Sequence, residues 1–139
     1  MISPVTIDAS VFVNAFSPIE EGSDTSLEFI NNIKKQGVPI ILPVLVLPEI
    51  TAAVARKQNN TELALKLQQE IKMFSNITFV DVDSSLADFA VEVAAQHRLR
   101  GSDAVYAAVS LRFGTELVTL DREQLERLPK VLSVRTPWN

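Results

Sequence analysis

The stretch VTIDASVF, residues 5–12, decides the fold that the sequence predicts. Its first three residues are all β-branched, a residue type enriched in strands, and this run ends at Asp8. The residues that follow, 9–15, favour a short helix. A short strand that leads directly into a helix is typical of a chain in which the two elements alternate.

The alternation continues along the rest of the chain. Further strands are predicted over 38–42, 77–82, 116–120 and 131–134, and helices over 25–36, 47–57, 61–75, 85–99, 103–113 and 121–128. Short connections and short apolar strands favour a parallel sheet that is covered by helices on both faces. We therefore expect one α/β domain, residues 1–139, around a mostly parallel sheet of four to five short strands.

Capping signals mark several of the predicted helix ends. Capping boxes begin helices at Thr25 and near Asn60, because their side chains can accept hydrogen bonds from free backbone N–H groups. Ser102 is the predicted cap of the helix that follows, and Gly37 ends an earlier helix in the left-handed conformation. The helix that begins at Thr25 would bury Leu27 on the same face as two isoleucines.

Composition excludes several classes of protein and site. At 47% hydrophobic and 22% charged residues, the chain has the composition of a folded domain. It has no cysteine and a single histidine, His97, which excludes disulfides, thiolate zinc sites, cysteine nucleophiles and a metal site built on two histidines. The formal net charge is −4, so any contact with nucleic acid must be local or must use a metal ion.

We expect a cytoplasmic protein with no membrane segment. No stretch reaches the roughly 18 consecutive apolar residues that a membrane helix needs. The sequence MISP, residues 1–4, lacks the basic region that opens a signal peptide.

Carboxylates follow the predicted strands at the edge where open parallel sheets bind ligands. Asp8 and Asp121 each come directly after a strand, while Asp103 and Glu49 lie near the beginnings of helices. Crowded carboxylates repel one another, and a divalent cation removes that conflict. Ligands that are all oxygen suit Mg²⁺ or Mn²⁺, which would reconcile an acidic protein with a phosphodiester substrate. Taken singly, each aspartate also fits a helix cap or a first-turn acid.

Four motifs carry a resemblance to a known family: TIDASVF (6–12), LPEI (47–50), GSDAVYAA (101–108) and LVTLD (117–121). In this order and spacing, which span almost the whole chain, the sequence resembles PIN-domain proteins of the small VapC-type toxin class. The resemblance implies a PIN-like three-layer α/β/α fold. It also implies a metal-dependent endoribonuclease, the toxin of a type II toxin–antitoxin pair.

The resemblance also implies which residues do the chemistry. The acidic quartet of the family falls on Asp8, Glu49, Asp103 and Asp121. Asp8 and Asp103 would ligate Mg²⁺ or Mn²⁺ directly. Glu49 and Asp121 would bind the ion through water or complete the shell of a second ion. The role usually proposed is activation of a metal-bound water for attack on an RNA phosphodiester.

Other polar residues accompany the quartet. Ser10 and Thr119 match polar positions that often line the site in the family. Five basic residues near the quartet are candidates for phosphate contacts, although a solvated surface charge is the more common role for any single one: Arg56, Lys57, Arg98, Arg100 and Arg122. His97 and Tyr106 are expected to pack rather than to react.

Proteins of this class are paired with a small antitoxin and commonly form homodimers, so the resemblance implies both partners. The antitoxin's C-terminal segment lies in a groove and often places a basic residue near the acids. The helices near 47–59 and 61–75 are the expected clip for it. The apolar surface of the second helix is wider than one stripe, which favours an interface; it comprises Leu63, Leu65, Leu67 and Ile71.

Two other classes of function are compatible with the motifs. Asp8 could be a nucleophile or phospho-acceptor, but this chemistry needs a lysine after a later strand, and no lysine of the sequence clearly holds that position. A binding module could keep the fold without catalysis, although the complete quartet argues against it. A stand-alone RNA-processing nuclease would have the same motifs.

Overall fold

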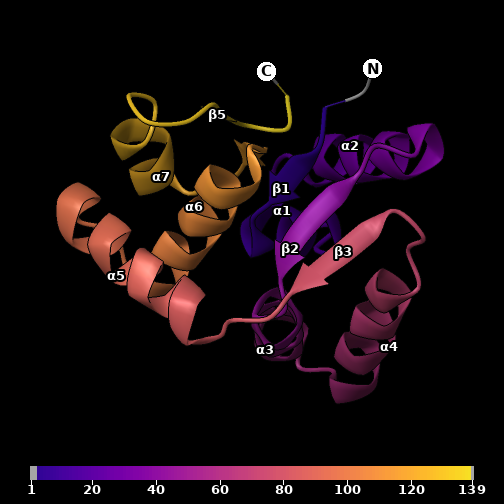
Figure 1. Cartoon of the computed structure of the whole chain (residues 1–139). Helices are drawn as coiled ribbons and strands as arrows, with labels where there is room; N and C mark the ends of the chain where they lie inside the picture. Colours follow the sequence, from indigo (N-terminus) through magenta and orange to yellow (C-terminus); the bar gives the residue numbers. More distant parts are fainter. Residues whose placement is uncertain (1–2, 139) are drawn as a thin grey trace.

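A parallel sheet of five strands, in the order β3-β2-β1-β4-β5, is the centre of the molecule (Figure 1). The computed structural model describes residues 3–138, so Met1 and Ile2 of the amino-terminal stretch lie outside it. The strands are β1 (Val5–Ile7), β2 (Ile40–Pro43), β3 (Ile77–Val80), β4 (Glu116–Val118) and β5 (Val134–Arg135). The predicted α/β class and parallel sheet are confirmed.

Seven helices connect the strands within the described part of the chain. They are α1 (Ala9–Ala15), α2 (Ser23–Gln36), α3 (Val46–Gln58), α4 (Thr61–Lys72), α5 (Ser84–His97), α6 (Gly101–Phe113) and α7 (Arg122–Arg127). Helix α6 packs across β1, β2 and β4, and α5 covers α6 from outside (Figure 1). Helix α1 packs against α2 and α3, and α4 packs against α3. The result is the expected three-layer α/β/α arrangement.

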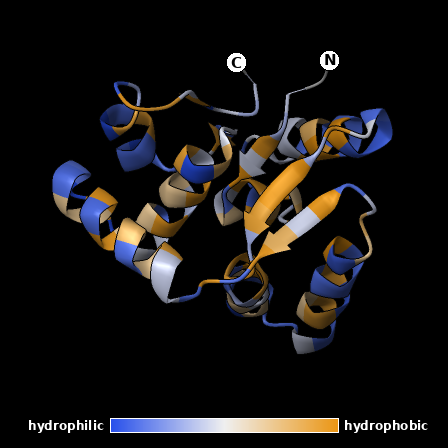
Figure 2. Cartoon of the chain, in the orientation of Figure 1, coloured by the Kyte–Doolittle hydropathy of each residue, from blue (hydrophilic) through white to orange (hydrophobic). Residues whose placement is uncertain are grey.

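The central strand β1 is buried along its whole length, which explains why it is short and β-branched. Thr6 is its one polar residue. Its hydroxyl donates to the Ile41 carbonyl at 2.8 Å and lies 2.6 Å from the hydroxyl of Thr115, which in turn donates to Ser110 at 3.1 Å. Figure 2 shows that β2 and β3 are also largely hydrophobic, although β3, at the edge of the sheet, is only partly buried. None of the helices within residues 3–138 has the length and hydropathy to cross a bilayer.

Several predicted helix ends are confirmed. Gly37 ends α2 with a φ of +67°. Asn60 caps α4 by accepting from the Leu63 N–H at 3.0 Å, and Asp121 caps α7 by accepting from two backbone N–H groups.

Other predicted ends are wrong by a few residues. Helix α2 begins at Ser23 after Gly22, rather than at Thr25, and Leu27 is 38% exposed. Ser26 takes the buried position instead, because its hydroxyl donates to Asn14 on α1 at 2.7 Å. Helix α6 begins directly after Arg100, before the predicted cap at 102. The last strand also lies later than predicted, because β5 pairs at Val134–Arg135 with β4.

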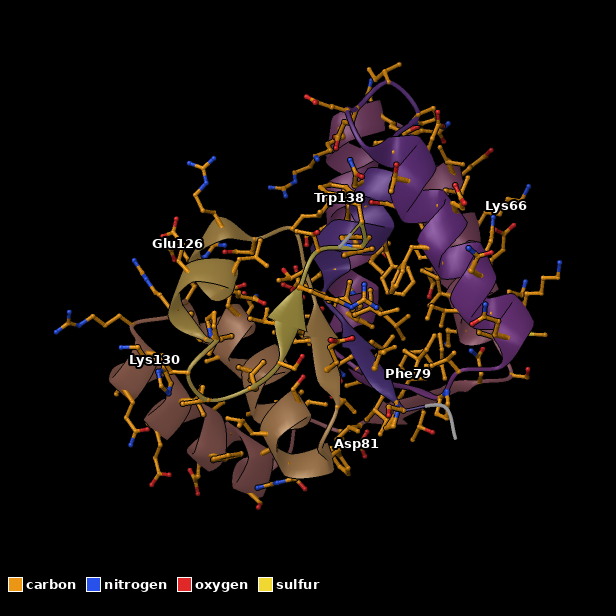
Figure 3. All side chains as sticks on the ribbon, turned by 90° about the horizontal axis from the view of Figure 1, so that it is seen from above. Lys66, Phe79, Asp81, Glu126, Lys130 and Trp138 are labelled. Atoms are coloured by element: carbon orange, nitrogen blue, oxygen red, sulfur yellow. The ribbon has the colours of Figure 1, made fainter. Side chains whose placement is uncertain are left out.

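The C-terminal segment packs over the loop that precedes α2. Figure 3, seen from above, shows Trp138 folded back over the N-terminal helices, whereas Lys66 and Lys130 point outward. Gly22 has a φ of +83°, and a Cβ there would lie 3.0 Å from Trp138 Cζ3. Gly114 has a similar φ of +67° but open space around it.

These two glycines give a matched test of that packing. We expect Gly114→Ala to lower the free energy of unfolding by about 1 kcal/mol, the cost of a left-handed residue with a side chain. Gly22→Ala should cost at least about twice as much, because Trp138 must also move. Chemical unfolding measures both values, and the fluorescence of Trp138, the only tryptophan of the chain, should change in Gly22→Ala alone. Equal costs with unchanged fluorescence would contradict this packing.

Candidate active site

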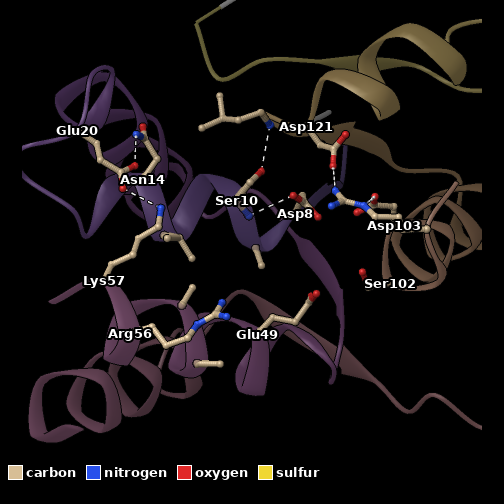
Figure 4. Close-up of a pocket in the computed structure, with 16 residues that line it drawn as sticks. Asp8, Ser10, Asn14, Glu20, Glu49, Arg56, Lys57, Ser102, Asp103 and Asp121 are labelled. Carbon is tan, nitrogen blue, oxygen red and sulfur yellow. Dashed lines mark hydrogen bonds and ion pairs between the residues drawn. The ribbon is translucent and has the colours of Figure 1, made fainter. Parts of the chain in front are cut away.

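Four helices begin around one pocket, and each carries a carboxylate at or near its N-terminus. Asp8 is the N-cap of α1 and Asp121 is the N-cap of α7, while Glu49 and Asp103 lie in the first turns of α3 and α6. All four line the same pocket, which has a volume of about 550 Å³ (Figure 4). Helix N-termini favour negative charge, so the fold partly offsets the crowding of these acids.

Asp8 is buried at the N-terminus of α1. The residue is 6% exposed, and its Oδ2 accepts from the Ser10 N–H at 3.1 Å and from the Thr119 hydroxyl at 3.3 Å. Burial raises the pKa of the Asp8 carboxyl, hydrogen bonds from Ser10 lower it, and the charges of Asp103 and Asp121 raise it. Ser10 and Thr119, predicted to line the site, therefore hold Asp8 in place.

Glu49 is oriented by a residue of another helix. The fully buried Tyr106 of α6 donates its hydroxyl to Glu49 Oε1 at 2.6 Å. Burial raises the pKa of Tyr106 well above 10, so the phenol keeps the proton that it donates. Burial also raises the pKa of Glu49, while the hydrogen bond from Tyr106 lowers it. The sequence predicts only packing for Tyr106, because its hydrogen-bond partner Glu49 is distant in the chain and no local pattern connects the two.

Asp103 and Asp121 are joined by a guanidinium. Arg100 Nε donates to Asp103 Oδ2 at 2.9 Å, and Arg100 Nη2 donates to Asp121 Oδ2 at 2.5 Å. The other oxygen of Asp103 accepts from Gln124 Nε2 at 2.9 Å, and Gln124 is fully buried. Burial raises the pKa of Asp103, the hydrogen bond from Arg100 lowers it, and the charge of Asp121 raises it.

Gln124 was not singled out from the sequence as a site residue. Its place three residues after Asp121 predicts a capping box, in which the glutamine side chain would reach back to the backbone of the cap. The structure turns this amide to Asp103 instead. Arg100 is detectable in principle, since its spacing of three from Asp103 allows an ion pair on a helix.

The far end of the pocket has a further carboxylate, Glu20, which is paired with a basic and a neutral side chain. Lys57 of α3 pairs with Glu20 at 2.7 Å, and Glu20 also accepts from Asn14 at 3.3 Å. Arg56 lines the same wall as Glu49 (Figure 4). Of the basic residues considered from the sequence, Arg56, Lys57 and Arg100 line the pocket. Arg98 lines a separate hollow together with His97.

The quartet shares a pocket but not a ready-made ion site. Within residues 3–138, no three acidic or histidine side chains are grouped closely enough to hold a metal ion as they stand. Two of the four carboxylates, Asp103 and Asp121, instead share the guanidinium of Arg100. The donor chemistry nevertheless fits Mg²⁺ or Mn²⁺: all four are oxygen ligands, and three have a pKa raised first of all by burial.

The buried charge of Asp8 should lower the stability of the fold at neutral and alkaline pH. Its folded-state pKa is raised, so the carboxyl costs stability as the pH rises through that pKa, and the cost is absent below the unfolded value. We expect Asp8→Asn, which keeps a good helix cap, to raise the free energy of unfolding by about 1 kcal/mol at pH 8 in the presence of a chelator. The gain should shrink as the pH falls toward about 4.

Thermal unfolding across this pH range measures the effect. Asp88→Asn, which removes an exposed carboxylate of α5, is the control and should change little. A loss of stability in Asp8→Asn at pH 8, or a gain that does not depend on pH, would contradict the electrostatic account.

Comparisons with solved structures show the same fold. The toxin VapC20 of Mycobacterium tuberculosis, described as cleaving the sarcin-ricin loop, aligns with a TM-score of 0.71 at 16% identity, over 92% of this chain and 98% of that one. VapBC2 of Rickettsia felis, solved bound to a promoter DNA fragment, gives 0.68 at 17% identity, over 96% and 98%. FitAcB of Neisseria gonorrhoeae gives 0.68 at 16% identity, over 97% and 99%. No curated protein matches the sequence significantly.

Sequence identities this low do not assign the chain to a family, but a match to a family model does. The model described as the PIN domain matches residues 5–131. This range holds the whole quartet and all but the last strand of the sheet. The chain belongs to the PIN domain family.

Proposed function

We propose that this protein is a metal-dependent endoribonuclease, the toxin of a type II toxin–antitoxin pair that acts in the cytoplasm. The observation that carries the proposal is the convergence of Asp8, Glu49, Asp103 and Asp121, from four helix beginnings, on one pocket of a PIN domain. The toxin VapC20, which shares the fold, is described as cleaving the sarcin-ricin loop.

The quartet would hold Mg²⁺ or Mn²⁺ through its carboxylate oxygens. When bound, such an ion lowers the pKa of a water molecule and offsets charge on a phosphoryl group. The protein's own groups prepare the ligands: Ser10 and Thr119 fix Asp8, Tyr106 fixes Glu49, and Gln124 fixes Asp103. A ligand held by a second hydrogen bond loses less freedom when it binds the ion.

The pocket also offers a place for the phosphate chain of the substrate. An acidic pocket alone repels a phosphodiester, whereas Arg56 on the α3 wall supplies a positive group that can bind phosphate oxygens with its planar fork. The guanidinium of Arg56 is exposed, and none of the described residues forms an ion pair with it. It can therefore bind a phosphate of the substrate without first breaking an ion pair.

An antitoxin and a second copy of the chain are the proposed protein partners. The similar structures include VapBC2 and FitAcB. Helix α4 exposes large apolar side chains, with Leu65 50% and Met73 at its end 81% exposed, a pattern typical of an interface. A short neighbouring reading frame that encodes a DNA-binding protein would support the pairing.

Cleavage of RNA by the purified protein tests the proposed activity. We expect cleavage with Mg²⁺ or Mn²⁺ and none with a chelator. Asp8→Asn and Asp103→Asn should each lower the rate at least about a hundredfold, because each removes charge that a divalent ion needs. Gel analysis of a mixed RNA pool gives the rates.

The control is Asp88→Asn, which carries the same change outside the pocket and should keep the wild-type rate. Cleavage that persists in the chelator, or in both pocket variants, would refute the proposal. Release of phosphate from small esters without cleavage of RNA would favour a phosphatase instead.

A further inference from the structure

Arg100 differs from the other basic residues of the pocket in that it pairs with two carboxylates of the quartet. Its side chain is 70% exposed, yet it bonds two carboxylates whose side chains are only 8% and 11% exposed. The guanidinium thus lies on the solvent side of Asp103 and Asp121. An ion that approaches these two carboxylates from solvent meets the guanidinium first.

The oxygens that Arg100 holds are the ones that other groups leave free. Asp103 Oδ1 is taken by Gln124, and Asp121 Oδ1 is taken by the backbone N–H groups of Glu123 and Gln124. Both Oδ2 atoms are taken by Arg100. A divalent ion that binds Asp103 and Asp121 through these oxygens therefore competes with the guanidinium for them.

The exchange requires movement of the arginine alone. The two carboxylates stay fixed by the buried amide of Gln124 and by the first turn of α7. Arg100 is already largely solvated, so its release costs little desolvation, and ion pairs with an exposed partner are individually weak. The position before α6 does not depend on this side chain, since it makes no capping hydrogen bond.

We propose that Arg100 is the resident counter-cation of the site and competes with the divalent ion for Asp103 and Asp121. This inference rests on the proposed metal-dependent function and adds the residue that sets its metal affinity. In the metal-free protein the guanidinium relieves the repulsion between the two aspartates. On metal binding it leaves them and remains at the rim of the pocket.

The affinity for Mn²⁺ alone, measured by calorimetry on the full chain at pH 7, tests the competition without any assay of activity. Arg100→Gln should bind Mn²⁺ about three- to tenfold more tightly than the wild type, since two weak ion pairs no longer oppose the metal. Without metal, the same variant should melt at a lower temperature than the wild type, and saturating Mn²⁺ should raise its melting temperature by more.

Arg122→Gln is the matched control. It removes the same charge from the residue next to Asp121, and none of the described residues forms an ion pair with Arg122. Its Mn²⁺ affinity should stay within about twofold of the wild type. An equal gain in both variants would reduce the effect to net charge and overturn the competition.

A second readout follows the guanidinium itself. The Nε–H resonance of Arg100, assigned by its loss in Arg100→Gln, should shift toward the position of a solvated arginine when Mg²⁺ is added. A resonance that stays unchanged at saturating Mg²⁺ would overturn the inference, as would an equal or weaker Mn²⁺ affinity in Arg100→Gln.

The outcomes separate this inference from the proposed function. If wild type and Arg100→Gln bind Mn²⁺ equally while Asp103→Asn does not bind it, the metal site stands and the competition is refuted. If none of the proteins binds Mn²⁺, the metal-dependent function is refuted together with the competition.

Discussion

The burial of neighbouring carboxylates in one pocket is the constraint on which the rest of the site depends. Burial raises the pKa of Asp8, Glu49 and Asp103, so each costs free energy when it is ionised. The fold compensates locally, with backbone N–H groups at Asp8 and Asp121, a phenol at Glu49 and a guanidinium at Asp103. A cation bound from solvent would lower the remaining free-energy cost of these ionised carboxylates.

The parallel sheet is what brings the acids together. Because β1 and β4 are adjacent and parallel, the segments that leave their carboxyl ends emerge at one edge. Asp8 and Asp121 lie on those segments. Glu49 and Asp103 reach the same edge through the first turns of α3 and α6. The hydrogen bond from Tyr106 to Glu49 joins these two helices.

The sequence predicts the elements better than the contacts between them. The β-branched run before Asp8, the cap at Asn60 and the glycine after α2 report local conformation, and the structure agrees with each. Predictions from local sequence were wrong where a hydrogen bond between distant segments determines which side chain is buried or where it points. Ser26 is buried in place of Leu27 because Asn14 accepts its hydroxyl, and Gln124 turns to Asp103 rather than to its own cap. The motifs placed the quartet in one pocket, but only the three-dimensional arrangement could place Arg100 between two of its members.

The order of the strands has a consequence for how the protein is made. The strand β1, which is synthesised first, lies between β2 and β4, and β4 comes from near the end of the chain. Until the ribosome has released the segment that carries Asp121, the nascent chain has Asp8 and Glu49 but lacks one wall of the pocket. The proposed nuclease site would therefore stay incomplete on the ribosome until the segment that carries β4 and Asp121 had been made.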